Sequence, residues 1–451
     1  MQAQGFRDTG RFSRRHTKPA EFTPANLKEL QRCCDLQANV ALPIRPRGAG
    51  TSATDCSEAP TGTVVHMTGL DRIVNIDTYN HTATAEAGVR IGRLVEALAE
   101  KGLELIGNPE QHERTLGGAI AAPCFGPAAG EQAGHFSSHV TSVKLVTGRG
   151  KVCRVSAEQV HLLNAVRSSY GMLGIIFEAT LNVRPITTFT TRYRRVPIED
   201  FGSVAASLED GVTGMKCYIM PYRGSVYLDL RRYEDNAGNT YRTPWKIRDW
   251  GESTVLPQVF KSLSRVVPVP AVRYRMIDSI SEATHGLVNT RLVRAGNHAS
   301  IGSRHRKRRK ARALLRSTWC FPATDFSLVL QAYRDFCEEV LDRSGYRCDM
   351  PAVGFRVARD PSSLLSPSFD EPVIALQTLS TQQRGWEDFV IDLAEFAEKW
   401  AGIPLFNESR ALRAEHASQV YTTRLDFFRK IRRQLDPENR LLNPFLAQSF
   451  T

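Results

Sequence analysis

Hydrophobic positions in the first hundred residues follow two different spacings along the chain. Apolar residues three or four positions apart predict a helix, whereas short apolar or alternating runs predict strands. The spacing predicts a helix over 24–37, a buried strand over 41–44, and further strands over 63–67, 72–76 and 82–87. Ile91, Leu94, Val95 and Leu98 then fall on one face of a helix that Gly102 ends.

The pattern continues with strands over 140–147, 151–155 and 174–183, the first two joined by a glycine turn at 148–150. Arg184-Pro185 follows the last strand and marks a domain boundary, because proline ends a regular ladder. This gives a first domain over 1–187.

Beyond residue 188 strands alternate with longer helices, which indicates a second α+β domain over 188–400. Strands are predicted at 215–220 and 225–230, helices at 325–343 and 386–400, and a polar, proline- and arginine-rich insertion over about 234–310. The tail over 401–451 supplies one amphipathic helix at 421–435 and an irregular end around Pro437 and Pro444.

Composition is that of a globular chain, with 42% apolar and 24% charged residues in 451. Seven charges of the formal +12 lie between Arg304 and Arg312, leaving a remainder of +5. This basic run is interpreted as a solvated loop or as a contact for an anionic ligand, lipid or partner. No aromatic residue interrupts it, so nucleic acid is not expected as a partner.

The nine cysteines are odd in number and lack C-x-x-C spacing, which argues against disulfides and against a metal cluster. No run of some 18 apolar residues and no secretory leader is found. We therefore expect a cytoplasmic protein without a metal or a transmembrane segment. Motifs of hydrolases and of P-loop kinases are missing too.

Candidate chemistry starts at the glycine turn over 46–52, which directly follows a predicted strand. Its two glycines can adopt positive φ, so that successive backbone N–H groups point into one concavity suited to phosphate oxygens. Gly48 to Ala53 also fits a Rossmann fingerprint, but Pro60 and Gly62 leave no room for the long helix that this fingerprint needs. A phosphate-binding nest and an ordinary tight turn are the remaining interpretations.

Two further segments rich in small residues, 115–126 and 168–176, favour the nest. Small residues let the backbone approach a flat ligand closely. Three such segments in one domain are hard to explain as independent turns.

In order and spacing, the three segments resemble the FAD-binding domain of the vanillyl-alcohol oxidase and p-cresol methylhydroxylase superfamily, over about 20–187 and again in the tail. Within it, sugar-lactone oxidases and decaprenylphosphoryl-ribose oxidase look nearest. The resemblance implies a two-part FAD-binding domain, a substrate (cap) domain with an antiparallel sheet, and a C-terminal segment that returns to the FAD domain. Carried over by position, the FAD shell comprises Arg47, Gly48, Ala49, Gly50, Thr51, Ser52, Thr115, Leu116, Gly117, Gly118, Ala121, Ala122, Cys124, Phe125, Gly126, Ile175 and Ile176.

Two departures from the family pattern bear on the cofactor. Members that tether FAD through the first loop have a histidine there, whereas this chain has Thr51 and Ser52, so FAD is expected to bind without a covalent bond. A His-Gly pair of the sugar-lactone oxidases is replaced by Phe125-Gly126. Cys124 is a conceivable nucleophile for the flavin, but a small buried side chain is the simpler interpretation.

The candidate catalytic residues are Asn407, Glu408, Arg410 and His112. Asn407 occupies the position of a lysine that lies beside the flavin in the lactone and ribose oxidases, so a cation is lost here. Glu408 and Arg410 are interpreted as a base and an anchor for an anionic substrate, or else as an ordinary ion pair. His112 is a further candidate base, or a solvated loop histidine.

The sequence therefore predicts an FAD-dependent oxidoreductase that oxidises a CH–OH group of a sugar-, polyol- or lactone-like small molecule. Oxygen or another electron acceptor would reoxidise the flavin. A flavoprotein for C–C or C–N oxidation is an alternative, and so is a basic anion- or nucleic-acid-binding protein.

Overall fold

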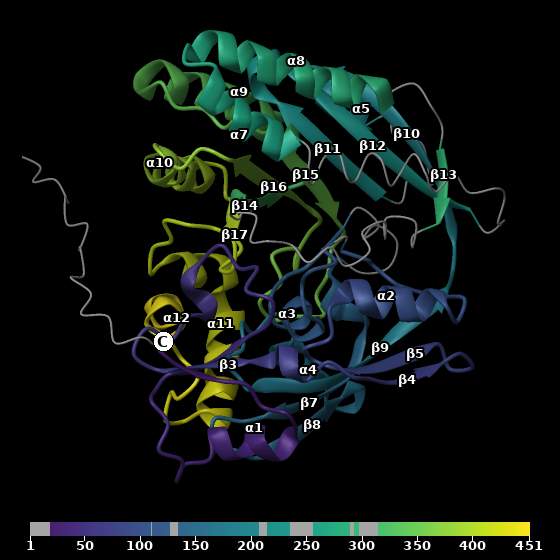
Figure 1. The fold of residues 1–451 in the computed structure, drawn as a ribbon, viewed down its shortest axis with the longest axis vertical. Helices are drawn as coiled ribbons and strands as arrows, with labels where there is room; N and C mark the ends of the chain where they lie inside the picture. The colour runs from purple at the N-terminus through teal and green to yellow at the C-terminus, as the bar shows by residue number, and fades with distance from the viewer. Residues whose placement is uncertain are drawn as a thin grey trace, which may run out of the picture.

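The computed structural model describes residues 19–109, 111–126, 134–206, 214–234, 256–288, 293–296 and 314–451. In this part of the chain, helices and sheets form two layers, one above the other in Figure 1. The basic run 304–312 and much of the predicted insertion lie outside the described residues. The predicted α+β class is confirmed.

The lower layer holds two sheets built from the N-terminal part of the chain. Parallel pairing joins the small sheet in the order β1-β3-β2, and the larger sheet has the order β4-β5-β9-β7-β8, with β6 also paired to β9. The strands are β1 (Ala20–Phe22), β2 (Ile44–Arg47), β3 (Thr63–His66), β4 (Ile73–Asp77), β5 (Thr82–Glu86), β6 (Leu103–Leu105), β7 (Val140–Val146), β8 (Val152–Ser156) and β9 (Ile175–Pro185).

Four short helices accompany these sheets. They are α1 (Leu27–Cys34), α2 (Ile91–Ala99), α3 (Leu116–Ala121) and α4 (Val160–Val166). Ile91, Leu94, Val95 and Leu98 of α2 are all buried, as their spacing predicts. The N-terminal prediction thus holds for the elements, with ends shifted by a few residues: β2 begins at Ile44 rather than at residue 41, and includes Pro46 and Arg47.

Two C-terminal helices, α11 (His416–Leu435) and α12 (Pro444–Phe450), pack into the core of the lower layer. Figure 1 shows them in yellow beside the N-terminal strands. The predicted irregular end around Pro444 is wrong, because the Asn443 side chain caps α12 by accepting from Leu446 N and proline occupies the first turn, where its missing N–H costs nothing. The predicted helix at 421–435 starts earlier and is kinked at Thr422.

The upper layer is an eight-stranded sheet, called here the cap sheet, in the order β13-β10-β12-β11-β15-β16-β14-β17. All of its strand pairs are antiparallel. The strands are β10 (Thr188–Pro197), β11 (Gly214–Met220), β12 (Ser225–Glu234), β13 (Val293–Gly296), β14 (Leu315–Pro322), β15 (Ala352–Val357), β16 (Val373–Ser380) and β17 (Ile403–Pro404).

Helices cover the cap sheet unequally. Its outer face packs against α5 (Phe201–Ala206), α9 (Phe326–Ser344) and α10 (Trp386–Lys399) in one apolar cluster. The opposite face meets the lower layer through Phe125, and its Tyr218 ring lies 4.3 Å from the His285 ring of α8 (Pro270–Val288). Together with α7 (Leu256–Val266), α8 belongs to the insertion that the sequence left without elements.

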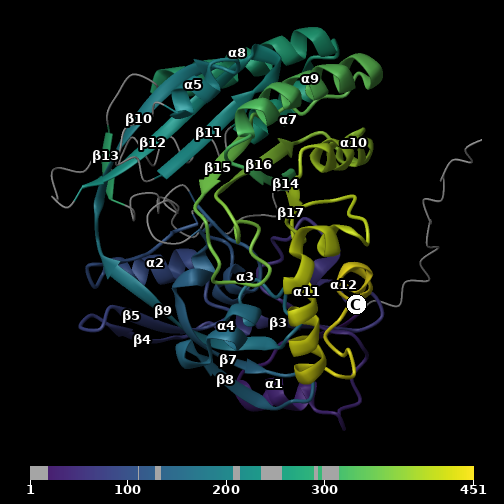
Figure 2. The ribbon, with the colours of Figure 1, turned by 180° about the vertical axis from the view of Figure 1, so that it is seen from behind.

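The loop between β15 and β16 reaches down from the cap sheet onto the lower layer, as Figure 2 shows. Asp360 in this loop is 2% exposed, and its carboxylate accepts hydrogen bonds from His135 N at 2.9 Å, from the Ser138 hydroxyl and from Ser362 N at 2.9 Å. Leu365 from the same loop enters the core of the lower layer. The loop therefore holds the two layers in a fixed relation, although the domain boundaries at 187 and 400 remain predictions.

We expect Asp360→Asn to lower the free energy of unfolding by about 1–3 kcal/mol, because an amide cannot accept from all three donors and presents N–H groups to some of them. Urea denaturation of both proteins checks this. Asp370→Asn, on the same loop but with a side chain 78% exposed, should stay within about 0.5 kcal/mol of the parent protein.

Asp360 also gives the prediction a pH dependence. Burial opposes ionisation, but His135 and the hydrogen bonds from Ser138 and Ser362 outweigh it and hold the pKa of Asp360 below its usual range. Its contribution is thus full above the unfolded-state pKa of about 3.9 and is lost as pH falls through the lower folded-state pKa. An equal effect of the substitution at pH 7 and below pH 3 would contradict this assignment.

Candidate functional site

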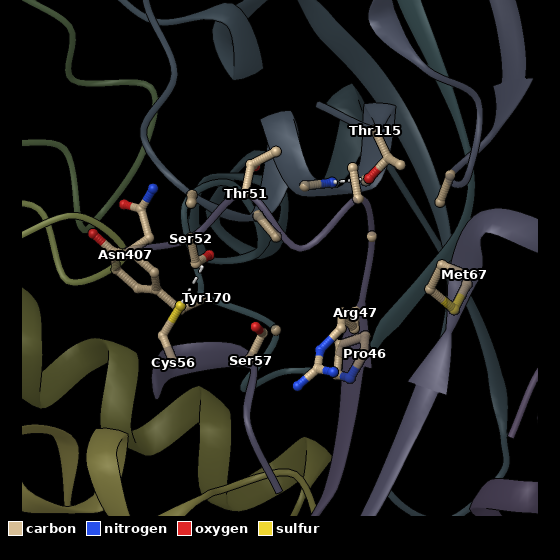
Figure 3. A pocket seen from close by; sticks show the side chains of 18 of the residues that line it. Pro46, Arg47, Thr51, Ser52, Cys56, Ser57, Met67, Thr115, Tyr170 and Asn407 are labelled. Carbon is tan, nitrogen blue, oxygen red and sulfur yellow. Dashed lines mark hydrogen bonds between the residues drawn. The ribbon is translucent and has the colours of Figure 1, made fainter. Parts of the chain in front are cut away.

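A cavity of about 790 Å³, its open mouth included, lies in the lower layer where it meets the tail. This volume is within the range of natural small-molecule sites. Its walls come from segments far apart in the sequence, among them the first loop (residues 46–52), the segment from Arg114 to Ala122 that includes α3, residues of the segment 168–176, and the tail residue Asn407. Figure 3 shows Asn407 beside Thr51, Ser52 and Tyr170.

The first loop approaches α3 so closely that only glycine fits. A Cβ added to Gly48 would lie 2.1 Å from Thr115 Oγ1, and one added to Gly117 would lie 2.8 Å from Ala87 Cβ. Thr115 in turn caps α3 by accepting from Gly118 N at 3.3 Å. Gly48 thus lets the first loop approach Thr115, and Gly117 lets α3 approach Ala87 after β5.

The first loop also leaves backbone donors free for a ligand. Gly50 has a φ of 67°, the left-handed conformation expected of such a turn. Among the hydrogen bonds of the described residues outside the strands, none is donated by the N–H groups of residues 49–52. Backbone donors in a loop that lines a cavity, and that have no protein acceptors, fit an anionic group such as a pyrophosphate.

The tail is pinned to the first loop by its own backbone. Ala53 N donates to the Asn407 carbonyl at 2.9 Å, the Thr54 hydroxyl donates to the Phe406 carbonyl at 2.6 Å, and Phe406 N donates to the Tyr170 hydroxyl at 3.3 Å. These contacts fix Asn407, which is 1% exposed. In the described part of the chain neither its Oδ1 nor its Nδ2 has a partner, although it lines the cavity.

An unpaired buried amide costs free energy unless something in the cavity completes its hydrogen bonds. The amide both donates and accepts, as the pyrimidine edge of a flavin does. The wall thus offers the Asn407 amide for the flavin and the N–H groups of the first loop for the pyrophosphate. The residues present fit FAD.

Glu408 lies behind the cavity wall and is fully engaged. Its carboxylate accepts from Arg114 Nη2 at 3.1 Å, from the Thr318 hydroxyl at 2.7 Å and from Gln377 Nε2 at 3.2 Å, and Arg316 Nε lies 3.9 Å from it. Burial alone would favour the neutral acid, but Arg316, Arg114 and the hydrogen bonds outweigh it and lower the pKa of Glu408. An ionised, saturated carboxylate is poorly suited to act as a base.

The other two candidate catalytic residues do not line the cavity. Arg410 is partly exposed and forms an ordinary ion pair, but its partner is Glu387 at 3.2 Å rather than the neighbouring Glu408. His112 packs against α2, where its Cβ lies 3.1 Å from the position of a Cβ on Gly92. Of the four candidates, the structure brings only Asn407 into the wall.

Most of the predicted FAD shell lines the cavity: Arg47, Gly48, Ala49, Gly50, Thr51, Ser52, Thr115, Gly117, Gly118, Ala121, Ala122 and Ile176. Leu116, Cys124, Phe125, Gly126 and Ile175 do not, although they belong to the same segments. Phe125 instead joins an apolar cluster with the cap sheet. Burial raises the pKa of the Cys124 thiol despite the nearby Arg114, so it stays neutral.

Several lining residues were missed from the sequence. Tyr170, Gly171 and Gly174 lie in the segment 168–176, which was singled out without a role for these three, and Arg114 directly precedes Thr115. Arg45 is 1% exposed and donates to the carbonyls of Cys56 at 2.7 Å and Tyr170 at 2.5 Å. An arginine directly between a predicted buried strand and the glycine turn was the available signal. Met67 and Ala87 carried none.

The described residues contain neither a candidate metal site nor a candidate membrane span. Within the ranges given above, no group of three or more His, Cys, Asp or Glu side chains could hold a metal ion. In the same ranges no helix is long and apolar enough to cross a membrane.

Comparison with known proteins agrees with this geometry. An FAD binding domain matches residues 19–156, and D-arabinono-1,4-lactone oxidase matches residues 179–449. The chain is 23% identical over 410 residues to L-gulono-1,4-lactone dehydrogenase of Mycobacterium tuberculosis, covering 89% of each chain. It is 33% identical over 144 residues to decaprenylphosphoryl-beta-D-ribose oxidase of Mycolicibacterium smegmatis, covering 32% of this chain and 31% of that protein.

Solved structures share the fold. Cholesterol oxidase from B. sterolicum superposes with a TM-score of 0.74 at 14% identity, covering 96% of this chain and 94% of that one. For 6-hydroxy-D-nicotine oxidase from Arthrobacter nicotinovorans the TM-score is 0.64 at 15% identity, covering 95% and 92%. The superfamily resemblance seen in the sequence is confirmed, and FAD is the cofactor. The chain belongs to the D-arabinono-1,4-lactone oxidase family and is an FAD-linked oxidoreductase.

Proposed function

We propose that this protein oxidises a CH–OH group of a sugar lactone or a related polyol. The observation that carries the proposal is the family match over residues 179–449, which includes both the cap sheet above the cavity and the tail that places Asn407 in its wall. Relatives that span 89% or more of this chain are lactone dehydrogenases or oxidases by name. Bound FAD supplies the hydride acceptor for such chemistry.

The cavity wall contributes binding and charge rather than proton transfer. Asn407 offers an unpaired amide. Burial alone would lower the pKa of Arg114, but its neighbours, the Glu408 carboxylate among them, outweigh burial and raise it, so Arg114 offers a charged guanidinium. Among the described residues that line the cavity there is no carboxylate and no imidazole. Glu408 acts here as a positioning residue, since it holds Arg114 without lining the cavity itself.

We further propose that FAD is held without a covalent bond. Thr51 and Ser52 line the cavity where a tethering histidine would be, and Cys124 is buried away from it as a neutral thiol. A cytoplasmic location is part of the same proposal, supported by nine cysteines of which all are free.

We expect anaerobic L-gulono-1,4-lactone or D-arabinono-1,4-lactone to bleach the visible flavin band of the purified protein. Admission of air, or of an artificial acceptor, then separates an oxidase from a dehydrogenase. Bleaching by none of a panel of lactones, polyols and aldoses would reject the substrate class.

Asn407→Ala tests whether the oxidation takes place in the cavity that Asn407 lines. Loss of the amide should lower kcat by at least about tenfold while FAD content changes little, because one hydrogen bond out of many cofactor contacts is removed. Arg410→Ala, three residues on and outside the cavity, is the matched control and should leave kcat nearly unchanged. Equal effects of the two substitutions would contradict the placement of Asn407 at the reacting end.

Acid precipitation should release the flavin into the supernatant, because no covalent bond retains it. Absorbance of supernatant and pellet measures the partition. Yellow colour that stays with the pellet would contradict the proposal. In that case Cys56→Ser is the informative variant, because Cys56 lines the cavity with its Sγ 3.5 Å from Ser52 Oγ.

A further inference from the structure

Asn407 brings no charge to the cavity, but two buried or half-buried arginines lie beside the residue that follows it. Arg114 is 4% exposed and lines the cavity. Arg316 projects from β14 of the cap sheet, and its Nη2 donates to the Thr51 carbonyl of the first loop. Both face the same oxygen of Glu408, at 3.1 Å for Arg114 Nη2 and at 3.9 Å for Arg316 Nε.

The charges of this group do not cancel. Glu408 contributes one negative charge and the two guanidinium groups contribute two positive charges, which leaves an excess of one. The second oxygen of Glu408 is occupied by Thr318 at 2.7 Å and by Gln377 at 3.2 Å, both neutral. In a buried site this excess is screened weakly, so it acts on whatever occupies the cavity.

Other arginines in the wall are engaged elsewhere. Arg47 forms an ion pair with Glu58 at 2.5 Å, and Arg45 is surrounded by backbone carbonyls of Cys56, Tyr170, Gly171 and Leu441. Of the arginines that line the cavity, Arg114 alone is joined to the tail residue that follows Asn407.

We infer that Arg114, Arg316 and Glu408 form a charge cluster with a net positive charge beside the neutral Asn407, and that this cluster stabilises negative charge on the bound flavin. Arg114 acts from the cavity wall. Arg316 raises the net charge of the cluster and Glu408 lowers it, and neither residue lines the cavity. The inference builds on FAD binding and on the proposed oxidation, but it concerns the electrostatics of the cofactor and requires no substrate.

The test is the affinity of the FAD-loaded protein for sulfite, whose addition to a flavin is favoured by positive charge nearby because the adduct is anionic. Loss of the visible flavin band follows the titration, with FAD kept saturating. Arg316→Met leaves a neutral Arg114–Glu408 pair and should weaken sulfite binding by about tenfold. Glu408→Gln removes the negative charge and should tighten it by about as much.

The decisive result is a change of sulfite affinity in opposite directions for Arg316→Met and Glu408→Gln. Structural damage around Glu408 would change the affinity of both variants in the same direction. Arg410→Met is the matched control: it removes an arginine two residues from Glu408 that does not line the cavity, and sulfite affinity should stay within about twofold. Arg114→Met should weaken binding more than Arg316→Met, and Arg114→Lys should recover part of it. If Arg114→Met fails to retain FAD, the sulfite affinities of Arg316→Met and Glu408→Gln test the inference.

Unchanged sulfite affinity in both Arg316→Met and Glu408→Gln, or a shift of the same sign in both, would overturn the inference. Midpoint potentials measured by dye equilibration should move in the same order as the affinities, higher for Glu408→Gln and lower for Arg316→Met. A protein that follows this order but oxidises no lactone would reject the proposed substrate and leave the charge cluster standing.

Discussion

The site depends on the ion pair and hydrogen bonds that the ionised Glu408 carboxylate makes with its neighbours. It is buried, and a buried charge is tolerated only where partners replace the water that it loses. Those partners come from the segment before α3, through Arg114, and from the cap sheet, through Thr318 and Gln377. Glu408 itself belongs to the tail, so one side chain ties together the lower layer, the cap sheet and the C-terminal segment.

Because Glu408 is held by these partners, the neutral Asn407 next to it is held in a fixed position as well. Asn407 precedes Glu408, and hydrogen bonds from Ala53 N and from the Thr54 hydroxyl hold the same stretch beside the first loop. The amide therefore faces the cavity without any hydrogen bond of its own to hold it there. We propose that bound FAD completes the hydrogen bonds of this amide, which folding leaves unpaired.

The sequence predicted the parts of the site that depend on local backbone. Gly48, Gly50, Gly117 and Gly118 are needed because their own conformation or their own missing Cβ is what the loops require, and that is visible in residue type alone. Met67 and Ala87, which follow β3 and β5, entered the cavity wall only through tertiary packing, as in the contact of Ala87 with Gly117 of α3, and this leaves no local signal. The C-terminal helix α12 was missed because proline was taken as an ending, although at the first turn it starts a helix.

By itself the sequence determined the α+β class and the order of strands and glycine segments, because each follows from residue spacing along short stretches. The resemblance of those segments to a known superfamily implied the flavin site. Only the tertiary structure decided what the charged residues do. Arg410 became a surface ion-pair partner, His112 packed against α2, and Glu408 turned from a candidate base into an ionised hub between two arginines. The physical reason is that the pKa and the reach of a side chain are set by neighbours from distant segments, which no local pattern encodes.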